Sequence, residues 1–168
     1  MQKKVQILGF LGLICFVLQF IPMPSIFHSS IIVMFYMISI YLFYIFSKAY
    51  QVNQLLKWNI WQIVIALVFG VMFSLLLLYV KSAMFYYALI AILVLLILVL
   101  AWLNYQIAKG LIILAQKTNN NGFRYSAVIL KYSAYTLPIL IGFIGLAIAN
   151  LCFLYGCIRF KSPSAELS

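Results

Sequence analysis

Long apolar runs with no charged residue dominate this chain of 168 residues. Hydrophobic residues make up 68% of it, charged residues only 7%, and its mean hydropathy is +1.19. A soluble domain is roughly 45–50% apolar and about 25% charged, because much of its surface must face water. We therefore expect an all-α integral membrane protein, since helices satisfy their own backbone hydrogen bonds inside lipid.

The apolar runs predict about five transmembrane helices, bundled in a single domain over residues 1–161, and a disordered tail over residues 162–168. The first run follows a basic start, as in a signal peptide, but no small-residue cleavage motif follows it. We therefore interpret it as a retained span. Pro22 and Pro24 fall in the connector after it, where a lost helical hydrogen bond costs least. The predicted spans are 5–21, 26–46, 60–80, 83–106 and 138–158.

The segments between these spans are less apolar. Residues 47–59 predict a short interfacial helix. Apolar character from residue 83 persists to Ala115, about 50 Å of helix against a hydrocarbon core of about 30 Å. That helix must therefore leave the membrane or break. Lys117–Gly122 reads as a loop, and residues 123–137 predict an amphipathic interfacial helix before the last span.

The charge balance concerns the orientation of the chain. Eleven basic residues oppose one acid, which gives a net charge of +10. The basic residues lie between apolar runs and form no tract that would bind nucleic acid. With a cytoplasmic N-terminus, five spans place eight of them inside and three outside, as the positive-inside rule expects for a protein of the cytoplasmic (inner) membrane.

A six-span alternative crosses at residues 123–141 and returns at residues 142–158. It moves Arg159 and Lys161 to the inside but leaves Lys131 near mid-membrane. A central lysine costs about 2.5–3.5 kcal/mol on insertion scales. We therefore favour five spans over six.

Residues suited to catalysis or metal binding are scarce. The acid, Glu166, lies in the tail, and the single histidine, His28, lies near the start of the second span. Cys15, Cys152 and Cys157 lie inside apolar runs without the spacing of a metal site. No phosphate-binding or dinucleotide-binding motif is present. We expect no catalytic residue, no cofactor and no metal, and therefore a protein that is not an enzyme.

Two asparagines and a group of small residues are candidates for contacts within the membrane. Asn104 and Asn150 lie in apolar runs, where an amide needs a partner. A helix–helix hydrogen bond supplies one, and the polar wall of a substrate path is the alternative. Gly142, Gly145 and Ala149 are candidate packing residues, because small residues let helices approach closely.

A basic segment in the second half is the candidate contact surface for anionic lipid or for an acidic protein partner. Basic residues near the bilayer surface each contribute about 1 kcal/mol of attraction to anionic lipid. The four residues are Lys109, Lys117, Arg124 and Lys131.

The second half also carries a recognisable order of features. Residues 103–118 read LNYQIAKGLIILAQKT, Gly122-Phe123-Arg124 follow, and residues 139–145 read ILIGFIG. This helix with an L-A-x-K-T phrase, a loop with an aromatic residue and a last span with glycines resembles an uncharacterised family of prokaryotic multi-pass membrane proteins, domain of unknown function 996. The resemblance covers residues 100–160, implies an integral membrane architecture and supplies no catalytic residues.

These observations predict a small non-enzymatic inner-membrane protein, an accessory, interaction or immunity-type protein that acts on a membrane-protein partner or on a second copy. The alternative is an oligomeric small transporter or channel subunit, in which Asn150 and Gly145 face the path. A lipid-modifying enzyme would need His28 as its base.

Overall fold

The computed structural model describes residues 1–79, 83–137 and 141–161. They form six α-helices, and the prediction of an all-helical chain is confirmed. The helices are α1 (Gln2–Leu18), α2 (Ser25–Tyr50), α3 (Asn53–Tyr79), α4 (Ala83–Thr118), α5 (Asn121–Thr136) and α6 (Gly142–Ile158).

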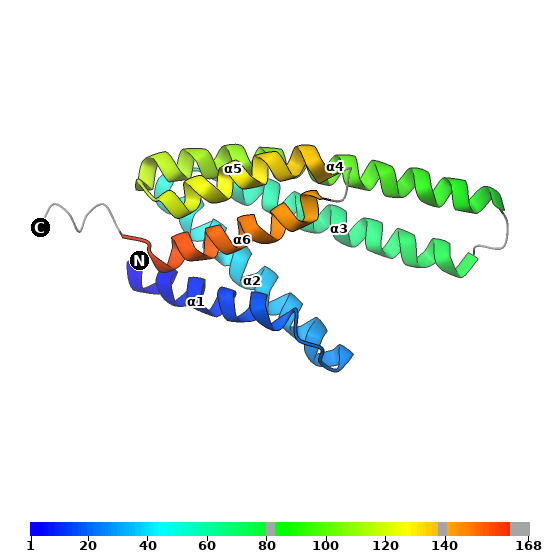
Figure 1. Cartoon of the computed structure of the whole chain (residues 1–168), viewed down its shortest axis with the longest axis horizontal. Helices are drawn as coiled ribbons and strands as arrows, with labels where there is room; N and C mark the ends of the chain where they lie inside the picture. Colours follow the sequence, from blue (N-terminus) through cyan, green and yellow to red (C-terminus); the bar gives the residue numbers. More distant parts are fainter. Residues whose placement is uncertain (80–82, 138–140, 162–168) are drawn as a thin grey trace, which may run out of the picture.

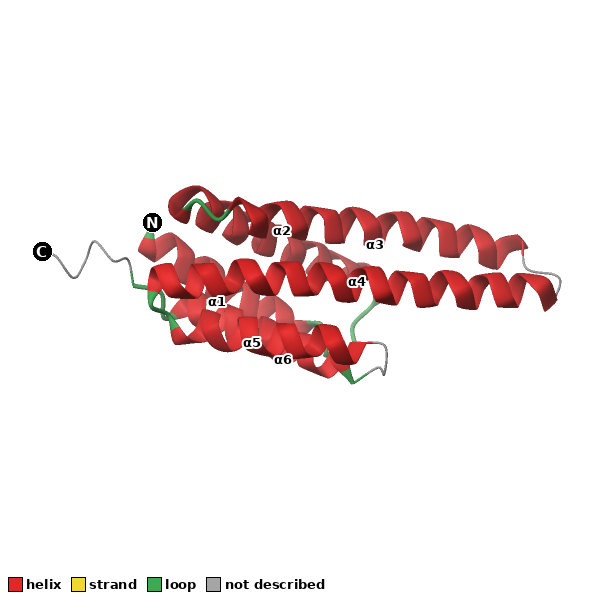
Figure 2. Cartoon of the chain, turned by 90° about the horizontal axis from the view of Figure 1, so that it is seen from above, coloured by secondary structure: helices red, strands yellow, loops and turns green. Residues whose placement is uncertain are grey.

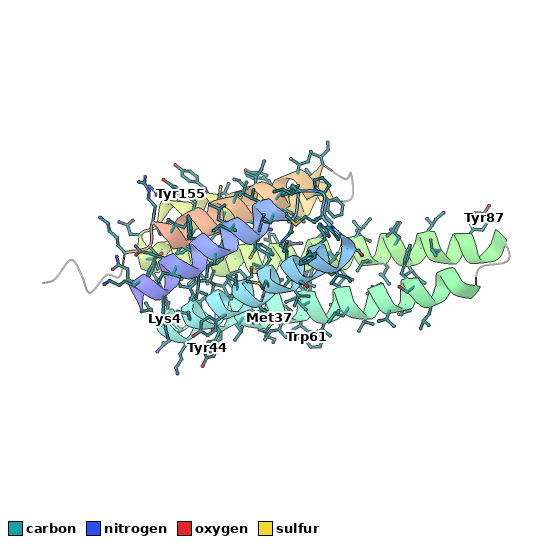
Figure 3. The ribbon with its side chains drawn as sticks, turned by 90° about the horizontal axis from the view of Figure 1, so that it is seen from below. Lys4, Met37, Tyr44, Trp61, Tyr87 and Tyr155 are labelled. Atoms are coloured by element: carbon teal, nitrogen blue, oxygen red, sulfur yellow. The ribbon has the colours of Figure 1, made fainter. Side chains whose placement is uncertain are left out.

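Successive helices run antiparallel, as three hairpins, and α6 packs against α1 so that the helices close into a ring (Figures 1 and 2). The start of α1 and the end of α6 lie at the same end of the molecule (Figure 1). We call this the terminal end; it also holds the α2–α3 and α4–α5 connections. The α3–α4 hairpin extends well beyond the other helices at the opposite end, where Tyr87 is labelled in Figure 3.

Three helices in the described part of the chain are long and apolar enough to cross a membrane. They are α2, the Asn53–Leu75 part of α3 and the Leu89–Thr118 part of α4, whereas α6 is a shorter apolar helix. The helix α4 has 36 residues, about 54 Å, and continues without a break through Asn104 and Lys109. The sequence predicted that this helix either leaves the membrane or breaks, and the predicted break is wrong.

The connections at the terminal end are tight. Gln51 adopts a left-handed conformation (φ 53°) and ends α2, and α3 begins two residues later. The expected interfacial helix over residues 47–59 is therefore wrong, because these residues belong to the end of α2 and the start of α3. Asn119 (φ 47°) likewise ends α4, and Asn120 caps α5 by accepting a hydrogen bond from the Gly122 N–H at 2.9 Å.

The amphipathic helix α5 runs alongside α4 and α6. Its buried face includes Phe123, Ser126, Ala127 and Leu130. This differs from the expected helix lying along the bilayer surface, because the apolar stripe is buried against two other helices of the same chain. The segment before α6 that was assigned to the last span, residues 138–140, lies outside the described residues.

The core is concentrated toward the terminal end. Phe46 of α2 is fully buried, with ring centroids 5.1 Å from Phe123, 5.6 Å from Phe160 and 6.2 Å from Phe153. Edge-on packing of such rings adds about 0.5–1.5 kcal/mol per pair to the burial energy. The outer surface is apolar as well: Met37 and Trp61, which are labelled in Figure 3, are largely exposed.

Candidate functional site: an uncharged polar cavity

Helices α2 to α6 enclose a cavity of about 190 Å³. Its polar lining comes from amides and hydroxyls, and the rest of its wall is aromatic or aliphatic. The amide and serine side chains are Ser39, Asn59, Gln62, Asn104, Ser126 and Asn150. We call it the amide cavity.

The α3 and α4 walls are joined through side-chain amides. Gln62 Nε2 lies 3.4 Å from Asn104 Oδ1, which makes a long and weak hydrogen bond. Asn104 Nδ2 donates to the Leu100 carbonyl at 2.8 Å. Asn59 lies one turn before Gln62 on the same face of α3, and its buried Oδ1 has no hydrogen-bond partner among the described residues.

The serine hydroxyls of the cavity are already engaged as donors. Ser126 Oγ donates to the Ala149 carbonyl at 2.8 Å, and Ser39 Oγ donates to the Phe35 carbonyl at 2.9 Å. Each hydroxyl oxygen can still accept a hydrogen bond. The Ser126 bond also ties α5 to α6 at a point where both helices line the cavity.

Two of the residues that line the cavity lie at the molecular surface. Of its lining residues, Tyr36 on α2 and Asn150 on α6 are largely exposed, while the others are buried or half-buried. None of the described lining residues carries a formal charge. This arrangement can donate and accept hydrogen bonds, but these residues offer no group that titrates near neutral pH.

His28 lies elsewhere, at the α1–α2 turn. Its Nε2 is 3.0 Å from the Gln19 carbonyl. The half-buried ring therefore closes the α1–α2 turn. No cluster of three or more His, Cys, Asp or Glu side chains occurs in the described part of the chain.

The structure brings the two predicted asparagines together, since Asn104 and Asn150 line the same cavity from α4 and α6. The predicted small residues lie on α6 where it meets α5. A Cβ added to Gly145 would collide with the Ser133 hydroxyl, and one added to Gly142 would collide with the backbone of Leu137.

The four predicted basic residues lie outside the amide cavity. Lys117 Nζ donates to the Tyr50 carbonyl at 2.6 Å, which satisfies a free carbonyl at the end of α2. Lys109 Nζ lies 4.6 Å from the centre of the Tyr105 ring. Arg124 and Lys131 are exposed on α5.

All ten lysines and arginines in the described part of the chain lie toward the terminal end. None is more than ten helical residues, about 15 Å, from that end of its helix. Lys4 marks this end in Figure 3. The ten residues are Lys3, Lys4, Lys48, Lys57, Lys109, Lys117, Arg124, Lys131, Arg159 and Lys161.

Asn59, Gln62 and Ser126 also line the cavity, and the sequence pattern had not singled them out. Two amides three residues apart share a helix face, and this spacing was a usable signal for Asn59 and Gln62. The sequence pattern also missed the crossing of Gly122 and Gly156, where a Cβ on Gly122 would lie 2.5 Å from the Gly156 Cα. Nothing in the sequence pairs two glycines 34 residues apart.

Comparison with protein-family models, with curated proteins and with solved structures finds no match for this chain. The described residues define the protein by its fold alone: they form six helices, three of which are apolar enough to span a membrane. The resemblance of residues 100–160 to the uncharacterised prokaryotic family stays a prediction.

Proposed function

We propose that this protein is an integral protein of the inner membrane, built from three helical hairpins that all insert from the cytoplasmic side. The gathering of the ten described basic residues at the terminal end supports this proposal most strongly. Basic residues are enriched on the cytoplasmic side of membrane proteins. Both termini and the α2–α3 and α4–α5 connections are then cytoplasmic.

The α3–α4 hairpin has the dimensions of a complete crossing. On α4, Lys109 and the exposed Tyr87 are 22 residues apart, about 33 Å, which matches a hydrocarbon core of about 30 Å. Lysine and tyrosine are typical of the two boundaries of that core.

The proposal replaces the five-span topology with the six-helix alternative. Arg159 and Lys161 now join the cytoplasmic side, where five spans placed them outside. Lys131 argued against six inserted helices, but it lies about 15 Å from the start of α5, close to the level of Lys109. The exposed Tyr132 beside it suits the headgroup boundary, to which a lysine side chain can extend.

We propose further that the protein is not an enzyme and that it acts by non-covalent binding, as an accessory, interaction or immunity-type protein. The amide cavity supports this, because its side chains can bind a neutral group and supply no acid or base. The basic terminal end adds attraction to anionic lipid, about 1 kcal/mol for each charge near the surface.

Crosslinking in cells followed by purification in a mild detergent tests this role. A photo-crosslinking amino acid replaces exposed Tyr132 in one variant and exposed Tyr87 in another. A discrete adduct that depends on the position of the crosslinker supports an interaction protein. A chain that forms no adduct at either position and purifies alone contradicts it.

An oligomeric small transporter or channel subunit is the second candidate. One observation favours it: Asn104 and Asn150 face the same cavity from different helices. Flux of a small neutral solute such as glycerol into proteoliposomes tests it. A folded, reconstituted protein that passes no solute counts against a transport role and leaves the interaction role standing.

A further inference from the structure

We infer that the amide cavity binds the hydroxyl headgroup of a neutral amphiphile, which enters from the surrounding lipid past the exposed Tyr36 and Asn150. The inference rests on the proposed membrane insertion of the helices. It adds a ligand class to the proposed binding role.

The polar wall of the cavity calls for a hydrogen-bonding partner. The buried Asn59 Oδ1 has no partner among the described residues, and a buried unsatisfied acceptor costs about 1–3 kcal/mol. A half-turn of the Asn59 amide would present Nδ2 in its place. A ligand hydroxyl can bond to the Asn59 amide in either orientation, because it both donates and accepts hydrogen bonds.

The other polar side chains of the cavity also favour a ligand that forms hydrogen bonds. Ser39 and Ser126 line the cavity and donate their protons to backbone carbonyls, so their oxygens are available only as acceptors. Gln62 and Asn104 meet only through a weak contact of 3.4 Å, so a ligand hydroxyl can compete for either amide. The wall therefore offers several acceptors and amide donors within one small volume.

The described lining of the amide cavity lacks the charged side chains that an ion site needs. Its described lining residues include no lysine, arginine, histidine, aspartate or glutamate. A carboxylate or ammonium headgroup would lose its hydration without gaining a counter-charge. The geometry therefore favours an uncharged headgroup over a fatty acid anion or an amine.

The remaining surface explains why the ligand carries an apolar chain. The cavity holds about 190 Å³, below the roughly 300–1,000 Å³ of pockets that enclose drug-sized ligands. Only a headgroup fits inside. Exposed Met37 lies beside Tyr36, and exposed Ile148 and Leu151 flank Asn150, so the attached chain passes over apolar side chains.

The depth of the cavity agrees with this ligand. Asn104 lies five residues, about 7.5 Å, beyond Lys109 toward the tip of the α3–α4 hairpin. In the proposed orientation this is just inside the hydrocarbon boundary of the cytoplasmic leaflet. A neutral lipid with a free hydroxyl places that group near this depth while its chain remains in hydrocarbon.

Photolabelling in nanodiscs of phosphatidylcholine, a lipid without a free hydroxyl, tests the inference. The probes are a diazirine-bearing octanol, the matching diazirine octane and the matching diazirine octanoate. We expect saturable adducts of the octanol probe on the α2 and α6 segments around Tyr36 and Asn150, displaced by excess octanol. The octane and octanoate probes label these segments at least fivefold less, about the factor for one neutral hydrogen bond.

Variants separate the site from the apolar surface. Asn150→Leu removes an exposed amide at the opening, and Asn59→Leu removes the buried one. Each lowers octanol labelling about fivefold. Gln54→Leu removes an exposed amide of α3 outside the cavity and leaves labelling unchanged. If Asn59→Leu does not fold, Asn150→Leu decides the matter alone.

Equal labelling by the octanol and octane probes overturns the inference, as does octanol labelling that Asn150→Leu leaves unchanged. Equal or stronger labelling by octanoate overturns it too. Labelling in nanodiscs does not depend on which side of a cell membrane the termini occupy. A failed labelling experiment is therefore distinct from a failure of the proposed topology.

Discussion

The helices α5 and α6 cross so closely at Gly122 and Gly156 that neither position has room for a side chain. A Cβ on Gly122 would lie 2.5 Å from Gly156 Cα and 2.7 Å from Gly156 N. These are backbone atoms, so rotation of a side chain cannot relieve the contact. Asn120 Nδ2 also donates to the Gly156 carbonyl at 2.9 Å, which holds the two segments together. Gly122→Ala must therefore push α5 and α6 apart.

The size of the effect follows from the overlap. Adding a methyl group to a closely packed site costs about 1–3 kcal/mol, and more where backbone must move. Gly122 lies in the first turn of α5, where the gain in helix propensity from Gly to Ala is at most about 1 kcal/mol. Because the atoms in the way are backbone, the upper part of that range, about 2–3 kcal/mol, applies, and the net loss is about 1–2 kcal/mol. For a chain of this size that lowers Tm by about 2–8 °C.

Thermal unfolding of the purified protein in detergent, followed by size-exclusion chromatography of heated samples, measures this change. Gly70→Ala is the matched control, because a Cβ at Gly70 on exposed α3 meets no atom within 4 Å. We expect Gly70→Ala to leave Tm unchanged or to raise it slightly. Equal Tm values for Gly122→Ala and Gly70→Ala would refute the close crossing of α5 and α6.

Three further substitutions have expected outcomes in the same assay. Asn120→Ala removes the cap of α5 and the bond to Gly156, and lowers the free energy of unfolding by about 1–2 kcal/mol; a loss near zero would contradict the cap. His28→Ala frees the Gln19 carbonyl and lowers stability by about 1 kcal/mol, while crosslinking to partners stays as in the native chain. Asn104→Leu removes a weak interhelical bond and a bond to the Leu100 carbonyl within α4, so stability falls by less than about 1 kcal/mol, and a larger fall would show a stronger network than the 3.4 Å contact indicates.

The sequence predicts the helices of this fold well, because apolar runs bounded by Pro, Asn and Lys specify them locally. The Asn-rich segment before Gly122 predicts the α4–α5 break correctly. What the sequence cannot decide is which surface an apolar stripe covers. The stripe of α5 suits a lipid boundary and a neighbouring helix equally, and the structure buries it against α4 and α6.

The candidate site shows the same limit. Asn104 and Asn150 stand out because amides are conspicuous in apolar runs, but their shared cavity depends on helices distant in the chain. Asn59 and Gln62 escape notice because they lie where a polar stretch passes into an apolar run. The contact of α1 with α6 that closes the ring joins the two ends of the chain, and no local pattern encodes it.

The side of the membrane on which the C-terminus lies tests the proposed topology most directly. Two reporters are fused in turn after Ser168 in cells, one active only in the cytoplasm and one active only outside it. Three hairpins inserted from the cytoplasm predict activity of the cytoplasmic reporter and none of the other. Activity of the external reporter alone would restore five spans and contradict the proposed role of the basic terminal end.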